Sequence, residues 1–422
     1  MSIVYKDPKG WLLDELSHAS RTLKVAPFGL KYAFKPEYFD TYAPHIAESS
    51  SASDAIACVN RTEQEDTTSR EKSGKTTRNN HEVKKKRKRK LRELNQGEID
   101  FHEYHTKIRK IILEGTKPLA AEGLSLGFLD RSGIRKESSR LAPITDDSRL
   151  ADLCEMARQL PLDSDSEPKA VQIIREEDMT SADDLDLFSS VTRNSTDCAR
   201  LVTLMGQKYL IPPHSSFLLS DISCIQPLLR CNNKFDVIII DPPWENKSVK
   251  RSNRYQFLPA HQLKQIPVPN LAAPECLIVT WVTNRQKHLR FVKDELYPFW
   301  SIEAVTDWWW VKITKAGEFV FPLESSHKKP YENLVLGRYR KSKEYFTSET
   351  ETTIYPIPDQ KIICSIPSTL HSHKPSLSEV LKEYISPDAR CLELFARNLQ
   401  PGWTSWGNEV LKFQHISYFN TI

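Results

Sequence analysis

The sequence lacks several features that define common protein classes. No apolar run reaches the ~18 residues that a membrane-spanning helix needs, and the N-terminus has no continuous apolar stretch typical of a secretory signal. Eight cysteines are scattered without a Cys-x-x-Cys pair, which argues against a disulfide scaffold and the usual zinc sites. Glycine is scarce, at 13 residues, and the dinucleotide fingerprint Gly-x-Gly-x-x-Gly is absent. We therefore expect no membrane partner, reduced thiols and no metal.

A general excess of positive charge is also missing. The chain has 59 Lys and Arg residues against 55 Asp and Glu, a net charge of +4, but Lys84 to Lys90 alone supply seven positive charges. Without this run, 52 basic residues face 55 acidic ones, which leaves −3. Any contact with nucleic acid must therefore depend on local basic patches.

Composition divides the 422 residues into four parts. Residues 1–46 are rich in apolar and aromatic residues, and the helical spacing of Leu12, Leu13 and Leu16 predicts a small segment that packs on the rest. Residues 47–90 have the composition of a disordered basic linker. Its basic run predicts a nuclear localisation signal or a nucleic-acid tether, with a merely solvated charge cluster as the alternative. Residues 91–198 are predicted to form a helical N-terminal domain, with an acidic surface segment over 163–186.

The fourth part, residues 199–422, alternates strand-like apolar runs with helical stretches, which predicts an α/β domain with a parallel or mixed sheet covered on both faces. Within it, alternation along 302–313 would place Trp308 and Trp310 on one face of a strand and Trp309 on the other. The predicted strands lie near residues 209–211, 217–219, 235–240, 276–282, 302–313, 334–336, 362–366 and 391–395, and the predicted helices near 285–296 and 376–385.

The sharpest motif closes one of these runs, where Asp241, Pro242, Pro243 and Trp244 follow the apolar residues 235–240. Proline cannot continue a strand, so the chain must turn out at its carboxyl end, where open α/β sheets bind ligands. A carboxylate, a free proline carbonyl and an indole suit a planar exocyclic amine such as adenine N6. The two oxygens can accept its N–H groups, and Trp244 can stack on the base. A structural aspartate at a turn is the alternative interpretation.

The motif and the sequence around it resemble the S-adenosylmethionine-dependent adenine-N6 methyltransferases with Asp-Pro-Pro-Trp, the eukaryotic mRNA adenosine methyltransferase family. Besides DPPWENKSVKRSNRY, the stretches FLLSDISCIQPLL, LIVTWVTNRQKHLRF, HKKPYENLVLGR, HSHKPSLSEVLKEY and LELFARNLQPGWTSWGNEVLKFQH carry the resemblance over about residues 200–420. It implies a Rossmann-like class I methyltransferase fold, circularly permuted so that the catalytic motif precedes the cofactor loop, with a mostly helical N-terminal extension.

The resemblance also assigns S-adenosylmethionine as the cofactor and implies which residues bind it. Lys374 matches the lysine that meets the methionine carboxylate, and Asp241 belongs to the same site. The loop matched here is shorter by two residues, including a His, than in the mRNA-methylating relatives, so its contacts can differ. The other implied cofactor-binding residues are Asp221 and Ile222 beside the adenine, and Arg397, Asn398, Asn408 and Glu409 near the ribose.

A basic loop follows the motif and is the predicted substrate-binding segment. Four positive charges interleaved with amide and aromatic residues suit a phosphate backbone and a single-stranded or flipped base, although a solvated loop has a similar composition. Asn284 and Arg285 also follow a strand end and are expected to line the same cleft. The candidate loop residues are Asn246, Lys247, Lys250, Arg251, Arg254 and Tyr255.

Together these features predict an enzyme that methylates adenine N6 of RNA. Within the family, the resemblance implies a small nuclear RNA substrate, specifically a 2′-O-methyladenosine of U2 small nuclear RNA. DNA adenine, a non-catalytic RNA-binding scaffold, and methylation of cytosine N4 or a side-chain amide are the alternatives. We further expect a monomer, because the N-terminal extension could cover a partner surface, and a nuclear location, with the cytoplasm as a second compartment.

Overall fold

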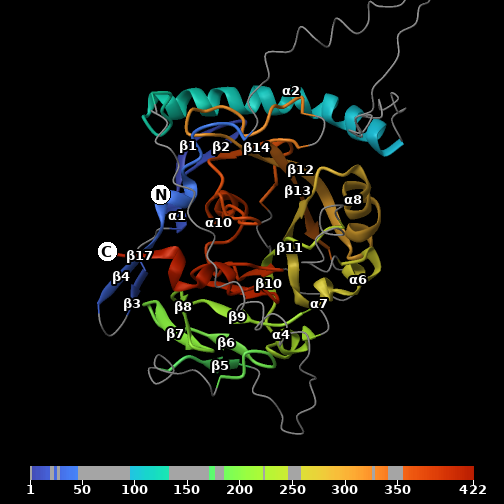
Figure 1. The fold of residues 1–422 in the computed structure, drawn as a ribbon. Coiled ribbons are helices and arrows are strands. Elements are labelled where there is room, and N and C mark those ends of the chain that lie inside the picture. The colour runs from blue at the N-terminus through green and yellow to red at the C-terminus, as the bar shows by residue number, and fades with distance from the viewer. Residues whose placement is uncertain are drawn as a thin grey trace, which may run out of the picture.

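Twelve strands of the described residues form one mixed sheet with helices on both faces, seen in a computed structural model (Figure 1). The structure describes residues 2–19, 23–25, 29–45, 96–132, 171–175, 185–221, 224–245, 258–325, 328–340 and 355–422. The predicted linker 47–90, residues 133–170 of the predicted helical domain, most of the acidic segment 163–186 and the basic loop 246–257 lie outside them.

Strand order places late segments of the chain beside early ones. β13, β1, β6 and β5 run against the other strands, so the predicted parallel or mixed sheet is confirmed as mixed. In spatial order the strands are β1 (Ile3–Asp7), β2 (Gly10–Leu13), β14 (Lys361–Ser365), β12 (Ile302–Lys312), β13 (Tyr331–Tyr339), β11 (Ala272–Val282), β10 (Phe235–Ile240), β15 (Cys391–Leu394), β16 (Trp403–Trp406), β9 (Ser216–Leu218), β6 (Val191–Arg193) and β5 (Val171–Ile173).

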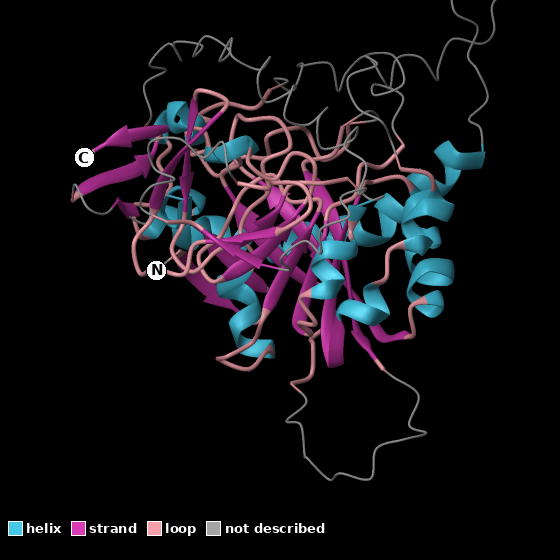
Figure 2. Ribbon diagram, turned by 90° about the horizontal axis from the view of Figure 1, so that it is seen from below, coloured by secondary structure: helices cyan, strands magenta, loops and turns pink. Residues whose placement is uncertain are grey.

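Helices flank the strands, which lie side by side in the middle of the molecule (Figure 2). The helices are α1 (Glu15–Ala19), α2 (Gln96–Ser125), α4 (Gln226–Arg230), α6 (Ala260–Gln265), α7 (Val268–Leu271), α8 (Gln286–Arg290), α9 (Tyr297–Phe299) and α10 (Ser378–Leu381), with a π-helix η4 (Phe291–Leu296) and 3-10 turns η1 (Pro36–Phe39), η6 (Lys382–Tyr384), η7 (Lys412–Gln414) and η8 (Ile416–Tyr418). Two small sheets contain β17 (Phe419–Thr421), β4 (Leu30–Phe34) and β3 (Leu23–Val25), and β7 (Arg200–Leu204) with β8 (Gln207–Ile211).

The central strand β10 is apolar on both faces because both faces are covered. Ile238 and Ile240 pack with α6, α8 and η4, whereas Val237 and Ile239 pack with α10 on the opposite face. Strands buried on two sides have continuous apolar sequences rather than alternating ones. The three tryptophans of β12 divide as predicted. Trp308 and Trp310 join the α10 face and Trp309 the α2 face.

The N-terminal residues belong to the sheet, which corrects two sequence expectations. Leu12 and Leu13 lie in strand β2, not in a helix, and only Leu16 is helical. Pairing of β2 with β14 supplies backbone hydrogen bonds that outweigh a short helical spacing. The described residues of 91–198 are not all helical either. They form α2 and the strands β5 and β6. Both strands belong to the main sheet, so the sheet includes residues that precede residue 199 in the sequence.

Helix α2 lies across β1, β2 and β14 at one end of the molecule (Figure 1). Its buried residues Ile108, Ile112 and Leu119 pack on the sheet face that also carries Trp309. A Cβ at Gly115 would lie 2.5 Å from Cγ1 of Ile362, so the helix approaches the sheet closely at that residue. The helix is thus part of the core that supports one side of the site.

Candidate active site

Asp241 follows directly on β10 and is 8% exposed. Its backbone N–H donates to the carbonyl oxygen of Leu394 on β15 at 3.2 Å, which continues the strand pairing by one residue. Pro242 then ends the strand, because proline has no N–H to donate. The chain therefore leaves the sheet at the carboxyl end of β10, as the sequence predicts, and the acid remains anchored to the neighbouring strand.

Two cations from separate segments meet the Asp241 carboxylate. Nη1 of Arg397 donates to Oδ2 at 3.0 Å, and Nζ of Lys374 lies 3.8 Å from Oδ1. Nε of Arg397 also donates to Glu409 at 2.9 Å. Four of the residues that the sequence predicts for the catalytic and cofactor sites are thus brought together from segments up to 168 residues apart, the separation of Asp241 and Glu409.

This cluster is part of a longer row of alternating charges. Lys374 bonds to Glu332 as well as facing Asp241, and Nζ of Lys312 donates to the other oxygen of Glu332 at 2.5 Å. Nζ of Lys412 donates to Glu409 at 3.0 Å. We call this set the charge row, and it runs in the order Lys312, Glu332, Lys374, Asp241, Arg397, Glu409 and Lys412.

Burial alone would neutralise members of the charge row, and their partners oppose this. Burial raises the pKa of Glu332, but Lys312 and Lys374 together hold it well below its usual range. Burial lowers the pKa of Lys374, but Asp241 and Glu332 raise it above its usual value. Lys412 and Arg397 likewise outweigh burial and lower the pKa of Glu409. The ionised forms are therefore favoured through mutual pairing.

Glu393, the third residue of β15, is a buried acid beside the charge row. Burial raises its pKa to about 7, against the opposing hydrogen bond from Gln400, whose Nε2 lies 3.2 Å from its carboxylate. Asp241 raises this pKa further, and Arg397 lowers it. Burial therefore favours the protonated form of this acid beside the ionised residues of the charge row.

Trp244 is more enclosed than the sequence suggests. Its indole is 8% exposed, donates from Nε1 to the carbonyl oxygen of Trp281 at 2.8 Å, and packs on the ring of His288 with centroids 4.9 Å apart. These contacts lock the turn after Asp241 to β11. Stacking of a base on Trp244 stays a prediction, and only the face away from His288 could serve it.

The segment after β11 holds the next part of the turn. Nη1 of Arg285 donates to the carbonyl oxygen of Glu245 at 3.1 Å, and Nε2 of His288 lies 3.2 Å from the same oxygen. Asn284 is half-buried and donates from Nδ2 to the carbonyl oxygen of Tyr331 at 2.7 Å. Arg285 and the catalytic turn are therefore in contact, as their positions at two strand ends predict.

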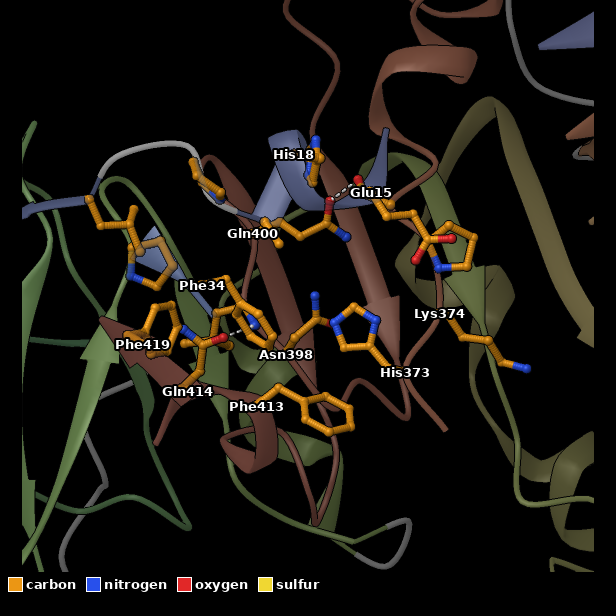
Figure 3. Close-up of a pocket in the computed structure, with 17 residues that line it drawn as sticks. Glu15, His18, Phe34, His373, Lys374, Asn398, Gln400, Phe413, Gln414 and Phe419 are labelled. Atoms are coloured by element: carbon orange, nitrogen blue, oxygen red, sulfur yellow. Dashed lines mark hydrogen bonds between the residues drawn. The ribbon is translucent and has the colours of Figure 1, made fainter. Parts of the chain in front are cut away.

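A cavity of about 70 Å³ extends from the implied cofactor residues into the N-terminal segment (Figure 3). Lys374 and Asn398 line it together with Glu15 and His18 of α1. Asp241 and Trp244 do not line it. A ligand at Asp241 must instead approach Oδ1, which Lys374 faces at 3.8 Å, because Nη1 of Arg397 bonds to Oδ2 at 3.0 Å.

Two further implied cofactor residues, Asp221 and Asn408, follow the carboxyl ends of neighbouring parallel strands. Asp221 follows β9, and its carbonyl oxygen accepts from the N–H of Cys224 at 3.1 Å. Asn408 follows β16 and is half-buried. Ile222 and the loop residues Asn246, Lys247, Lys250, Arg251, Arg254 and Tyr255 lie outside the described residues.

Comparisons with known proteins agree with this geometry. The MT-A70 family matches residues 235–409, from the start of β10 to Glu409. A human protein named N(6)-adenine-specific methyltransferase METTL4 is 54% identical over 395 residues, which cover 93% of this chain and 81% of that protein. The chain belongs to the MT-A70 family.

More distant MT-A70 relatives differ in the substrate that their names state. A Caenorhabditis elegans protein named DNA N6-methyl methyltransferase is 28% identical over 338 residues, 78% of this chain and 84% of that protein. A Pyricularia oryzae protein named N6-methyladenosine RNA methyltransferase MTA1 is 36% identical over 220 residues, 50% of this chain and 56% of that protein. MT-A70 methyltransferases use S-adenosylmethionine, and their α/β fold agrees with the predicted class.

Sequence reasoning missed Glu332, Lys312 and Glu393. Their signal was a charged residue inside or at the end of an apolar strand, where a charge needs a partner. In the described ranges no group of three His, Cys, Asp or Glu side chains is placed to hold a metal ion. Nor does any helix there have the length and apolar character needed to cross a membrane.

Proposed function

We propose that this MT-A70 protein transfers the methyl group of S-adenosylmethionine to N6 of adenosine in RNA, specifically a 2′-O-methyladenosine of U2 small nuclear RNA. Its family and its 54% identity to a named N6-adenine methyltransferase make the chain an enzyme of that class. The observation that carries the proposal is Asp241, buried at a strand end, with one oxygen bonded to Arg397 and the other facing Lys374.

The proposed mechanism uses acceptors to activate a poor nucleophile, because the N6 lone pair is delocalised into the adenine ring. Asp241 and the carbonyl of Pro242 would accept the two N–H groups of the amine. This favours the tetrahedral nitrogen that develops in the transition state more than the planar ground state. The bound donor supplies an electrophilic methyl group on a sulfonium sulfur. Holding the amine in line with that group contributes much of the remaining rate. As the N6–methyl bond forms, the methyl–sulfur bond would break with its electron pair left on sulfur, and the Asp241 carboxylate would take up one N6 proton and pass it to solvent.

The donor set at this edge fits S-adenosylmethionine. Its methionyl end carries a carboxylate and an ammonium group, which match the half-buried Lys374 and the buried Asp241. Arg397, Asn398, Asn408 and Glu409 follow β15 and β16 and offer polar groups for the ribose. We assign Asp221, which follows β9, and its neighbour in the sequence, Ile222, to the adenine. β10 carries the catalytic motif at its end, and β15 leads into the implied cofactor loop. The two strands are neighbours in the sheet, and β10 comes first in the sequence. This order, with the motif before the cofactor loop, supports our inference of a circularly permuted methyltransferase fold.

The RNA assignment needs a direct comparison, since named relatives include both an RNA and a DNA enzyme. We would give the protein labelled S-adenosylmethionine with three matched oligonucleotides, a U2-derived RNA with 2′-O-methyladenosine, the same RNA with unmodified adenosine, and the DNA equivalent. Nucleoside mass spectrometry would identify the product. A higher kcat/KM on the 2′-O-methylated RNA supports the proposal, and a preference for DNA would replace it with the alternative.

We also propose nuclear accumulation directed by Lys84 to Lys90, with the cytoplasm as a second compartment. Replacing the seven basic residues by alanine should move a fluorescent fusion out of the nucleus, and an unchanged distribution would refute this.

A monomer is proposed because β1 and β2 already extend the sheet beyond β14. Light scattering of the full chain tests it.

A further inference from the structure

Helix α2 is connected to the segment after β11 by a continuous chain of hydrogen bonds. Nε1 of Trp309 donates to the hydroxyl of Tyr104 at 3.3 Å, and this hydroxyl donates to Oδ1 of Asn333 at 2.8 Å. Nδ2 of Asn333 donates to Oδ1 of Asn284 at 2.9 Å, and Nδ2 of Asn284 donates to the carbonyl oxygen of Tyr331 at 2.7 Å.

The donor and acceptor groups at the two ends of this series determine the direction of each hydrogen bond in it. The indole of Trp309 can only donate, and the backbone carbonyl of Tyr331 can only accept. Asn284 must therefore turn Nδ2 toward Tyr331 and Oδ1 toward Asn333. Asn333 must in turn present Nδ2 to Asn284 and Oδ1 to Tyr104. A flip of the Asn284 amide would break its bonds to both Tyr331 and Asn333.

The elements at both ends are firmly placed. Asn333 lies on β13 between Val282 and Trp309 and is 1% exposed. Next to Tyr104 on α2, the ring of His105 stacks on Tyr331 with centroids 6.0 Å apart, and its Nδ1 lies 3.1 Å from the Tyr331 hydroxyl. Burial lowers the pKa of His105 to about 4, so this contact is made by a neutral imidazole at physiological pH.

Two neighbouring residues of β13, Glu332 and Asn333, make contacts with different parts of the site. Glu332 bonds to Lys374 and Lys312 in the charge row, whereas Asn333 faces α2. Asn284 is followed at once by Arg285, whose guanidinium holds the carbonyl of Glu245 in the catalytic turn. The Asn284 amide is therefore held on two sides, by the Tyr331 carbonyl and, through Asn333, by Tyr104 of α2, within a segment that contacts the turn.

We propose that Tyr104 is a positioning residue for the target base, acting through Asn333 to orient the amide of Asn284 toward the nucleotide. This rests on the proposed function. Nδ2 of Asn284 has a second N–H that the chain of bonds does not use. An amide N–H recognises a ring-nitrogen acceptor, such as those that flank the N6 amine of adenine. Asn284 is thereby a specificity contact and Tyr104 sets its geometry.

The test compares Tyr104→Phe with Tyr297→Phe, a matched loss of a buried tyrosine hydroxyl. Tyr297 donates to the carbonyl oxygen of Val335 at 2.6 Å on the same strand β13 but has no bond to Asn284. We expect Tyr104→Phe to raise the KM for adenine-containing RNA roughly 3- to 10-fold, with an unchanged Kd for S-adenosylmethionine. Tyr297→Phe should lower the Tm similarly and leave this KM unchanged.

A double-mutant cycle decides whether Tyr104 acts through Asn284. In an Asn284→Ala background, Tyr104→Phe should have no further effect on KM, because the amide that it orients is gone. The same KM increase in both backgrounds, or an equal increase in Tyr297→Phe, would overturn the proposal. If Tyr104→Phe does not fold, Asn333→Asp replaces it, since it keeps the acceptor for Tyr104 but turns an oxygen toward Asn284. A wild-type protein without methyl transfer would refute the proposed function instead. The positioning role would then be read from the Kd for RNA alone in the same cycle.

Discussion

The substitution Glu332→Gln would show how much the charge row contributes to the stability of the protein and to methyl transfer. Glu332 bonds to Lys312 and Lys374, so Glu332→Gln keeps the side-chain volume but removes the negative charge between two ammonium groups. Removing one partner of a buried pair costs about 3–5 kcal/mol. The Glu332 and Lys374 side chains are 24% and 18% exposed, so solvent screening should reduce the loss to the lower end of this range.

The same substitution should impair methyl transfer beyond its effect on stability. Lys374 then has Asp241 as its remaining carboxylate in the charge row, at 3.8 Å, and is expected to move onto the oxygen that would accept the target amine. Displacements of about 1 Å at a reacting group can cost 10²-fold in rate, so we expect a drop of at least about tenfold in kcat.

Urea unfolding and single-turnover methyl transfer would measure the two effects. Glu383→Gln is the control, because it removes a carboxylate from an exposed ion pair with Lys6 whose side chains are 37% and 48% exposed. Such pairs contribute about 0–1 kcal/mol. If Glu332→Gln matched Glu383→Gln in both stability and rate, the charge row would not have the role described above.

Three further changes give distinct expectations. Arg397→Lys should weaken binding of S-adenosylmethionine about tenfold by calorimetry, because a lysine cannot span Asp241 and Glu409 as the guanidinium does; unchanged affinity would exclude this role. Lys250→Ala with Arg251→Ala should reduce the slope of log K against log salt by about 0.7 per lost phosphate contact with single-stranded RNA, and an unchanged slope would place the RNA elsewhere. Burial raises the pKa of Glu15 to about 8, so the stability from its protonated form is present below the unfolded value near 4.5 and is lost as pH rises through 8. Glu15→Gln should therefore lose less stability between pH 6 and 9 than wild type in urea titrations, and parallel curves would contradict the burial argument.

The central strands could be predicted because their signal is local and strong. β10 matches residues 235–240 because a β-branched apolar run that ends in two prolines allows few alternatives. The same residues predicted that Asp241 lies at the carboxyl end of a strand. The three-residue strands β5 and β6 gave no comparable pattern, since their pairing rather than their periodicity makes them strands.

The charge row could be predicted only in part. Asp241, Lys374, Arg397 and Glu409 came from motifs, but their contacts join strands that are far apart in the sequence. Glu332 stands beside Lys374 only because β13 lies next to β11 and β12 in the sheet. The link from Tyr104 to Asn284 depends on the docking of α2 against that sheet, which local helical periodicity does not specify.

Asp241→Asn tests the central claim most directly. Asparagine preserves the shape but replaces one acceptor oxygen by an N–H donor, so a two-acceptor grip on the N6 amine is lost. With labelled S-adenosylmethionine and the preferred oligonucleotide, we expect N6-methyladenine from the wild-type protein and at least a 10²-fold lower rate from the variant, on the order of the loss of one transition-state hydrogen-bonding group. Equal rates of N6 methylation by the two folded proteins would contradict the assignment of Asp241 as the group that activates the amine.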